Sequence, residues 1–261
     1  QPIDLPAGTR LAIEYVYDNS ENNDNNPVRP LRRVRFGQES ADEMGTCPFS
    51  LTLRDLRERA ELQLATTDRD LEKIPDAWNL LMRKCQLERE RGNFAVAEKA
   101  IEKACKISPG AAAVWFERGM LGESMHKLET AASSYQQALR IDKNHAMAHM
   151  QLGTLFGRSG NDAKALLHFG EAVRVLPNSP RAHNNFATAN FAANKLKVAE
   201  RHYRRAIALQ ATYFNAQFNL ARVLVGMGRK EAARQELKRA AELRPREPAV
   251  QQLLKQLDAG K

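Results

Sequence analysis

The chain repeats itself with a period of 34 residues over most of its length, and this constrains the fold more than any other feature. Each unit carries small residues at its eighth, twentieth and twenty-seventh positions and a large apolar residue at its twenty-fourth. The four clearest units start at Ala112, Ala146, Pro180 and Phe214. A period of this length indicates a supersecondary unit that buries its apolar face only against copies of itself. The sequence therefore predicts a stack of similar units rather than one closed core.

Each unit is predicted to form two helices joined by a tight turn. Glycines in the turns, at Gly92, Gly160 and Gly228, permit the left-handed backbone that ends a helix, and prolines stand where several second helices must stop. We expect five units, over residues 78–111, 112–145, 146–179, 180–213 and 214–247. A connecting helix or linker is expected over residues 51–74, and a capping helix over residues 248–261, because an apolar stripe continues there.

The period, the small residues and the aromatic at the twenty-fourth position (Tyr135, Phe169, Tyr203) resemble the tetratricopeptide repeat (TPR) family over residues 75–247. The resemblance implies an all-α solenoid, a right-handed superhelix of helical hairpins. In that family, positions 2, 5, 6, 9 and 12 of the first helix line a concave groove that binds peptides. Around those positions the resemblance implies a groove lined by Phe116, Met120, Met147, Met150, Gln151, Thr154, Arg158, Arg181, Asn184, Asn185, Thr188, Phe191, Asn215, Phe218, Asn219 and Arg222.

The predicted groove mixes cations, amides and apolar groups. Its three arginines can make charge-assisted contacts with a carboxylate. Asn185 and Asn219 hold the sixth position of consecutive units and could each pair with a peptide amide. The TPR subclass that clamps a chaperone's C-terminal carboxylate has lysine at position 5, where Asn184 and Phe218 stand here, so that partner is not expected.

Charge and hydropathy narrow the classes of partner. Residues 1–50 hold five Arg against eight Asp and Glu (−3), so the remaining residues of this +9 chain carry +12. Basic residues are interleaved with Glu along many helical faces, which favours a solvated surface and argues against a nucleic-acid partner. No apolar run approaches 18 residues, so a soluble chain without a membrane span is expected.

A solenoid has no deep pocket for catalysis, so we expect a non-enzymatic scaffold with a protein or peptide partner. The oligomeric state of the chain stays open.

Histidines and cysteines offer little evidence of a metal site. His145 and His149 have the i,i+4 spacing that places two imidazoles on one helical face. However, His149 and His183 share position 4, and His168 and His202 share position 23, which indicates a packing feature of neighbouring units. The three cysteines form no CxxC pair, so neither a zinc site nor a disulfide framework is predicted.

The first fifty residues follow a different pattern. Residues 11–17 alternate as a β-strand does, residues 18–27 are rich in loop-forming Asn and Asp, and two more short strands are indicated near residues 34–36 and 47–53. A small N-terminal β segment over residues 1–50 is therefore expected. Three strands cannot bury both faces alone, so this segment should lean on the first helices or on sequence upstream.

Part of this segment resembles the end of the C-terminal domain of bacterial copper type II, ascorbate-dependent monooxygenases. The resemblance is carried by the ordered series Tyr17-Asp18-Asn19-Ser20, Asn26-Pro27, Gly37-Gln38-Glu39-Ser40 and Asp42-Glu43-Met44. It implies that Met44 is one copper ligand, that two histidines come from sequence upstream, and that the protein is exported to the periplasm. An alternative function is thus the C-terminal part of such an enzyme. Otherwise Met44 is an ordinary core residue, and no cofactor is expected.

Overall fold

The computed structural model describes residues 56–259, and every regular element in this range is an α-helix. The helices are α1 (Leu56–Lys73), α2 (Trp78–Glu90), α3 (Phe94–Ile107), α4 (Ala112–Ser124), α5 (Leu128–Ile141), α6 (Ala146–Arg158), α7 (Asp162–Val175), α8 (Pro180–Ala192), α9 (Leu196–Leu209), α10 (Phe214–Gly226), α11 (Lys230–Leu243) and α12 (Pro248–Ala259). The predicted all-α solenoid is confirmed for this part of the chain. The β segment expected over residues 1–50, Met44 included, lies outside the described residues.

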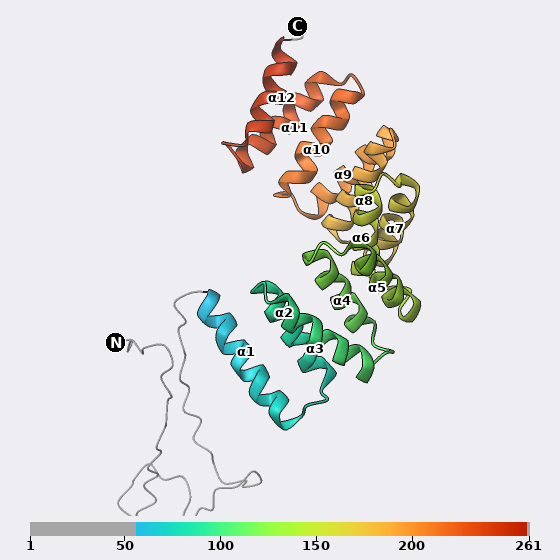
Figure 1. The fold of residues 1–261 in the computed structure, drawn as a ribbon. Coiled ribbons are helices and arrows are strands. Elements are labelled where there is room, and N and C mark those ends of the chain that lie inside the picture. The colour runs from blue at the N-terminus through green and yellow to red at the C-terminus, as the bar shows by residue number, and fades with distance from the viewer. Residues whose placement is uncertain (1–55, 260–261) are drawn as a thin grey trace, which may run out of the picture. The chain divides into compact units, whose positions relative to one another are not determined.

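Helices α2 to α11 pack as five consecutive hairpins, each against the next (Figure 1). All substantial contacts join helices that are adjacent in the chain or two apart. Helix α1 packs on α2, where Lys84 Nζ donates to Asp68 Oδ1 at 2.7 Å. Helix α12 packs on α11, where the Arg234 guanidinium donates to the Leu257 carbonyl and to the Asp258 carboxylate. The hairpins therefore form a stack of neighbours rather than a compact bundle.

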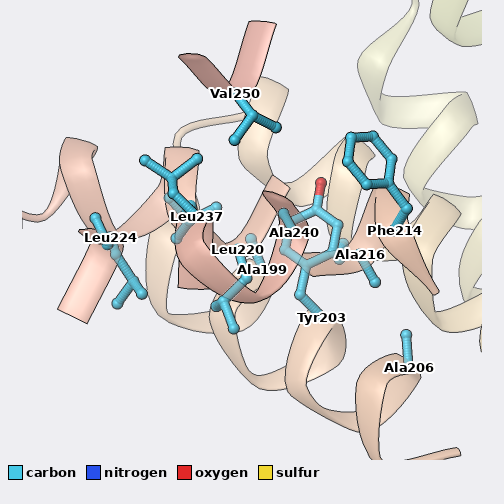
Figure 2. Packing of buried hydrophobic residues seen from close by; sticks show 14 of the residues in the cluster. Ala199, Tyr203, Ala206, Phe214, Ala216, Leu220, Leu224, Leu237, Ala240 and Val250 are labelled. Carbon is cyan, nitrogen blue, oxygen red and sulfur yellow. The ribbon is translucent and has the colours of Figure 1, made fainter. Parts of the chain in front are cut away.

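The small residues of the repeat let the two helices of a hairpin approach closely. A Cβ added to Gly119 would lie 2.3 Å from Tyr135 Cε1, and one added to Gly153 would lie 2.8 Å from Phe169 Cδ1. Positions 8 and 24 are thus direct packing partners, as the sequence pattern predicts. In the last units the small residue is alanine, and the apolar residues of this region form one buried cluster around Tyr203 (Figure 2). The periodicity therefore reports close helix packing.

The turn inside each hairpin has one residue in the left-handed region, at position 15. Gly92, Gly160 and Gly228 have φ values of 79°, 74° and 73°, while His126 and Asn194 occupy the same position with φ of 58° and 56°. Glycine adopts this conformation without steric cost, and a residue with a Cβ does not. Two of the five turns are therefore built from a residue that is less suited to them.

The side chain at position 4 of the first helix forms a hydrogen bond with the loop that precedes its unit. In five consecutive units, counting α12 as the start of a sixth, this side chain donates an N–H to the carbonyl oxygen six residues earlier. The donors are Trp115 (to Pro109, 2.8 Å), His149 (to Lys143, 3.1 Å), His183 (to Pro177, 3.0 Å), Gln217 (to Ala211, 2.8 Å) and Gln251 (to Pro245, 3.1 Å). Each bond satisfies a loop carbonyl near the end of the preceding second helix. This bond requires only a side-chain N–H that reaches the carbonyl oxygen, so Trp, His and Gln can all occupy position 4.

Candidate partner-binding surface

The first helices of the hairpins lie side by side. Helix α2 contacts α4, α6 contacts α8, and α8 contacts α10. Between α4 and α6 the link is a side-chain hydrogen bond, because Gln151 Nε2 donates to Glu123 Oε2 at 2.8 Å. We call the residues at positions 2, 5, 6, 9 and 12 of α2, α4, α6, α8 and α10 the A-helix surface. It contains nearly all of the groove residues predicted from the sequence.

Solvent exposure divides the predicted residues into three groups. Exposed residues are Met147, Arg158, Arg181, Thr188, Asn215 and Arg222. Half-buried residues are Phe116, Met120, Gln151, Thr154, Asn185, Phe191, Phe218 and Asn219. Two residues are buried, Met150 and Asn184.

The structure removes Met150 from the predicted set of groove residues. Its side chain is 2% exposed and packs with Ala172 and Ala182 in the core. It therefore supports the A-helix surface from below and cannot contact a ligand. Arg158 stands at position 13, the last residue of α6, and so lies at the edge of the surface rather than within it.

The upstream part of the A-helix surface, on α2 and α4, contains two acidic residues that the predicted list omitted. Glu117 Oε1 accepts from Arg89 Nε at 2.9 Å, and its Oε2 accepts from Gln86 at 3.1 Å. Burial raises the pKa of Glu117, and the Arg89 charge opposes that rise. These residues hold positions 6, 9 and 12 of their units, so the position rule itself could have found them.

Glu123 forms the second upstream link. Its Oε2 accepts from the Tyr135 hydroxyl at 2.7 Å as well as from Gln151. Burial and this carboxylate together raise the pKa of the Tyr135 hydroxyl, so it stays protonated and donates. The polar groups of the upstream part are thus paired with each other across consecutive hairpins.

The downstream part, on α8 and α10, is arranged differently. The buried Asn184 amide donates to Asn185 Oδ1 at 3.3 Å, and Asn184 Oδ1 has no hydrogen-bond partner. The Arg222 guanidinium lies 5.2 Å from the centre of the Phe191 ring and donates to Asn219 Oδ1 at 3.4 Å. Helices α6, α8 and α10 carry no Asp or Glu. The charge on this stretch of the A-helix surface is therefore entirely positive.

The histidines form two pairs within hairpins. His149 Nδ1 lies 3.0 Å from His168 Nδ1, and His183 Nδ1 lies 2.9 Å from His202 Nδ1. Since Nε2 of His149 and of His183 donates to a carbonyl, the neutral ring accepts at Nδ1, and the facing ring donates. Each pair therefore holds one proton between two nitrogens. The packing role expected from the recurrence agrees with this, although the partners come from positions 4 and 23 of one unit.

His145 and His149, which are four residues apart, have different partners, since the ring of His149 pairs with that of His168. His145 is instead the N-cap residue of α6, where its Nδ1 accepts from the Ala148 N–H at 3.2 Å. Among residues 56–259, no group of three or more His, Cys, Asp or Glu side chains could hold a metal ion. Cys85 and Cys105 are buried free thiols, and burial raises the pKa of Cys85 to about 12.

None of the helices in the described range is long and apolar enough to cross a membrane.

Two family models, both described as tetratricopeptide repeat, match the chain. One matches residues 83–146 and 150–214, and the other matches residues 190–257. Among curated proteins, anaphase-promoting complex subunit 3 of Schizosaccharomyces pombe is 26% identical over 180 residues, which are 69% of this chain and 27% of that protein. The inactive TPR repeat-containing thioredoxin TTL3 of Arabidopsis thaliana is 33% identical over 78 residues, or 30% of this chain and 11% of that protein. The chain thus spans less than a third of either relative.

Solved structures share the fold. YrrB, described as a TPR protein with an unusual peptide-binding site, matches with a TM-score of 0.61 and 17% identity over 72% of this chain and 97% of that one. The APC/C hetero-tetramer Cut9-Hcn1 matches with a TM-score of 0.65 and 14% identity over 77% of this chain and 40% of that one. At these identities the similarity is one of architecture.

Proposed function

The chain belongs to the tetratricopeptide repeat family, and we propose from this membership that its A-helix surface binds an extended peptide segment of a partner protein. Proteins of this family typically mediate protein–protein interactions and are generally not enzymes. The peptide and its place on the A-helix surface are our proposal.

The observation that carries the proposal is the arrangement of Asn185 and Asn219. Both stand at position 6 of consecutive hairpins, both are half-buried, and the Oδ1 of each already accepts a hydrogen bond within the chain. Each Nδ2 is therefore left to donate. Two amide donors repeated at the spacing of the units suit the carbonyls of an extended main chain.

The surrounding surface is suited to side chains of mixed character. Met147 is exposed, and Phe116, Met120, Phe191 and Phe218 are half-buried, so they offer apolar contact without forming a sealed pocket. Methionine adapts to differently shaped partners. Such a surface favours recognition of a peptide segment over chemical transformation of a small molecule.

Nucleic acid is the less favoured partner. Several arginines of the second helices are already neutralised by carboxylates, as in the pairs of Arg174 with Glu171 and of Arg239 with Glu236. Because these cations are spread around the stack and paired, they do not form the continuous basic track that a phosphate backbone requires.

Peptides that bind the full chain are first selected from a phage-displayed library of random 12-residue sequences. The selected peptides are the probe for the test. We expect the double variant Asn185→Ala, Asn219→Ala to bind the selected peptides about tenfold or more weakly, since two hydrogen bonds are lost. Its circular dichroism should not change, because neither side chain is part of the apolar core. Asn185→Ala also removes the acceptor of the buried Asn184 amide, so a lower Tm is expected, and affinities are compared well below both melting temperatures.

The matched control is the double variant Asn144→Ala, Asn178→Ala. These asparagines lie in loops, where their Oδ1 atoms accept from Arg174 and Arg205, away from the A-helix surface. It should bind like the wild type. Equal affinities of the wild type and the A-helix variant would refute the proposed site.

A further inference from the structure

The A-helix surface has two chemically different parts. In the upstream part, the carboxylates of Glu117 and Glu123 are satisfied by side chains of the same chain. A ligand that used these groups would first have to break hydrogen bonds that are already made, which costs free energy. In the downstream part, on α8 and α10, the helices carry no carboxylate that could pair with Arg181 or Arg222, so a ligand that brings negative charge gains most there.

Arg222 is the central group of the downstream part. It makes no ion pair with any carboxylate of the described residues, whereas Arg89, Arg229 and Arg234 each do. Its guanidinium is held over the Phe191 ring and against Asn219 Oδ1. A guanidinium fixed by a ring and one acceptor keeps several N–H groups for a further partner. It is therefore a preorganised and unused cation.

The half-buried and exposed polar groups around Arg222 are also donors. Asn185 and Asn219 have their oxygens occupied, so each presents its Nδ2. The Thr188 hydroxyl is already used within the chain, because it donates to the Asn184 carbonyl oxygen at 2.9 Å and lies 2.9 Å from the Tyr203 hydroxyl. Arg181, at position 2 of α8, adds a second exposed cation without an acidic partner among the described residues. A complementary ligand must therefore supply acceptors and negative charge.

We propose that the A-helix surface of α8 and α10 takes an extended acidic peptide, with an Asp or Glu carboxylate on Arg222 and main-chain carbonyls on Asn185 and Asn219. This inference rests on the proposed function and names its ligand class. Carboxylate and guanidinium form strong, charge-assisted hydrogen bonds. The Phe191 and Phe218 rings contact the apolar parts of the segment.

The test uses the full chain and the phage-selected 12-residue peptides, labelled with a fluorophore. We expect Asp and Glu to be enriched among the selected sequences. Replacing the best acidic residue of a selected peptide by its amide, Glu by Gln or Asp by Asn, should weaken binding to the wild type about tenfold. Against the Arg222→Gln variant, the same replacement should have almost no effect, because the partner of the carboxylate is gone.

Arg205→Gln is the matched control. Arg205 is an exposed arginine on α9 that donates to Asn178 and lies outside the A-helix surface. It should preserve the full effect of the peptide replacement. If the acid-to-amide replacement weakens binding to Arg222→Gln but no longer to Arg205→Gln, the carboxylate of the peptide binds at the second helices. That result would overturn the inference.

The failures of the two proposals are distinguishable. If Asn185→Ala with Asn219→Ala weakens binding but the acid-to-amide replacement does not, the peptide site stands and the acidic ligand class is refuted. If neither variant of the A-helix surface changes binding, both proposals are refuted.

Discussion

Lowering the pH from 7.5 to 5 is expected to destabilise the solenoid through its two histidine pairs. The pKa of His168 and that of His202 are each lowered to about 4. In both cases the main cause is burial, and the second is the charge of the facing ring, His149 or His183. Placing a proton on each of the two facing nitrogens would break the bond that joins the rings.

The sign of the effect follows from linkage. A histidine in the unfolded chain titrates near pH 6.5, so between that value and about 4 the unfolded chain binds more protons than the folded one. Stability is therefore complete above about pH 6.5 and is lost as the pH falls toward 4. For one histidine with these two values, the loss between pH 7.5 and 5 is about 2 kcal/mol. Since both rings are partly exposed, solvent screening reduces this to about 1 kcal/mol each, or about 2 kcal/mol in total.

Urea denaturation followed by circular dichroism at the two pH values measures this loss. Carboxylates also titrate in this range, so the informative quantity is the difference between the wild type and the double variant His168→Gln, His202→Gln. Glutamine can donate to the facing Nδ1 and does not titrate. The variant is expected to lose about 2 kcal/mol less than the wild type on acidification.

His126→Gln provides the control, because His126 is exposed in a turn and makes no hydrogen bond to another histidine. Its loss of stability on acidification should equal that of the wild type. If the double variant loses as much stability as the wild type, the pairs do not control the response and the reasoning is refuted.

Four other variants test the hairpin packing, a turn and the anchoring of α12. Gly119→Ala should destabilise the chain by about 1–3 kcal/mol, because the new Cβ would meet Tyr135. Gly157→Ala, with an ordinary 3.8 Å contact, should be neutral or stabilising in the same urea titration. His126→Gly should raise stability by about 1 kcal/mol, since the left-handed backbone suits glycine, and a lower Tm would contradict this. Arg234→Ala should speed amide exchange in α12 while α2 keeps its protection, and unchanged exchange in α12 would show that this arginine does not anchor it.

The sequence could predict the hairpins because the packing partners recur at fixed spacing within one unit. Gly119 and Tyr135 meet as the eighth and twenty-fourth positions predict, and the same relation holds for Gly153 and Phe169. Such contacts are local, so a period alone is enough to find them.

The sequence could not predict how deeply equivalent positions of the first helices are buried. Position 5 was expected to face a ligand, yet the Met150 side chain is in the core while Phe116 at the equivalent position is half-buried. The histidine pairs were missed for a similar reason, since positions 4 and 23 lie on different helices and meet only once the hairpin is packed. The pairing of Glu117 and Glu123 needed the same tertiary information.

The hairpins of the described range make their substantial contacts with neighbouring hairpins, and the repeat places similar apolar side chains at each junction. Removing or inserting one whole 34-residue segment would join surfaces that already match, with alanines and an aromatic or leucine in the same places. Gene duplication could therefore lengthen this protein without designing a new interface. The length of its recognition surface is therefore set by the number of repeat units.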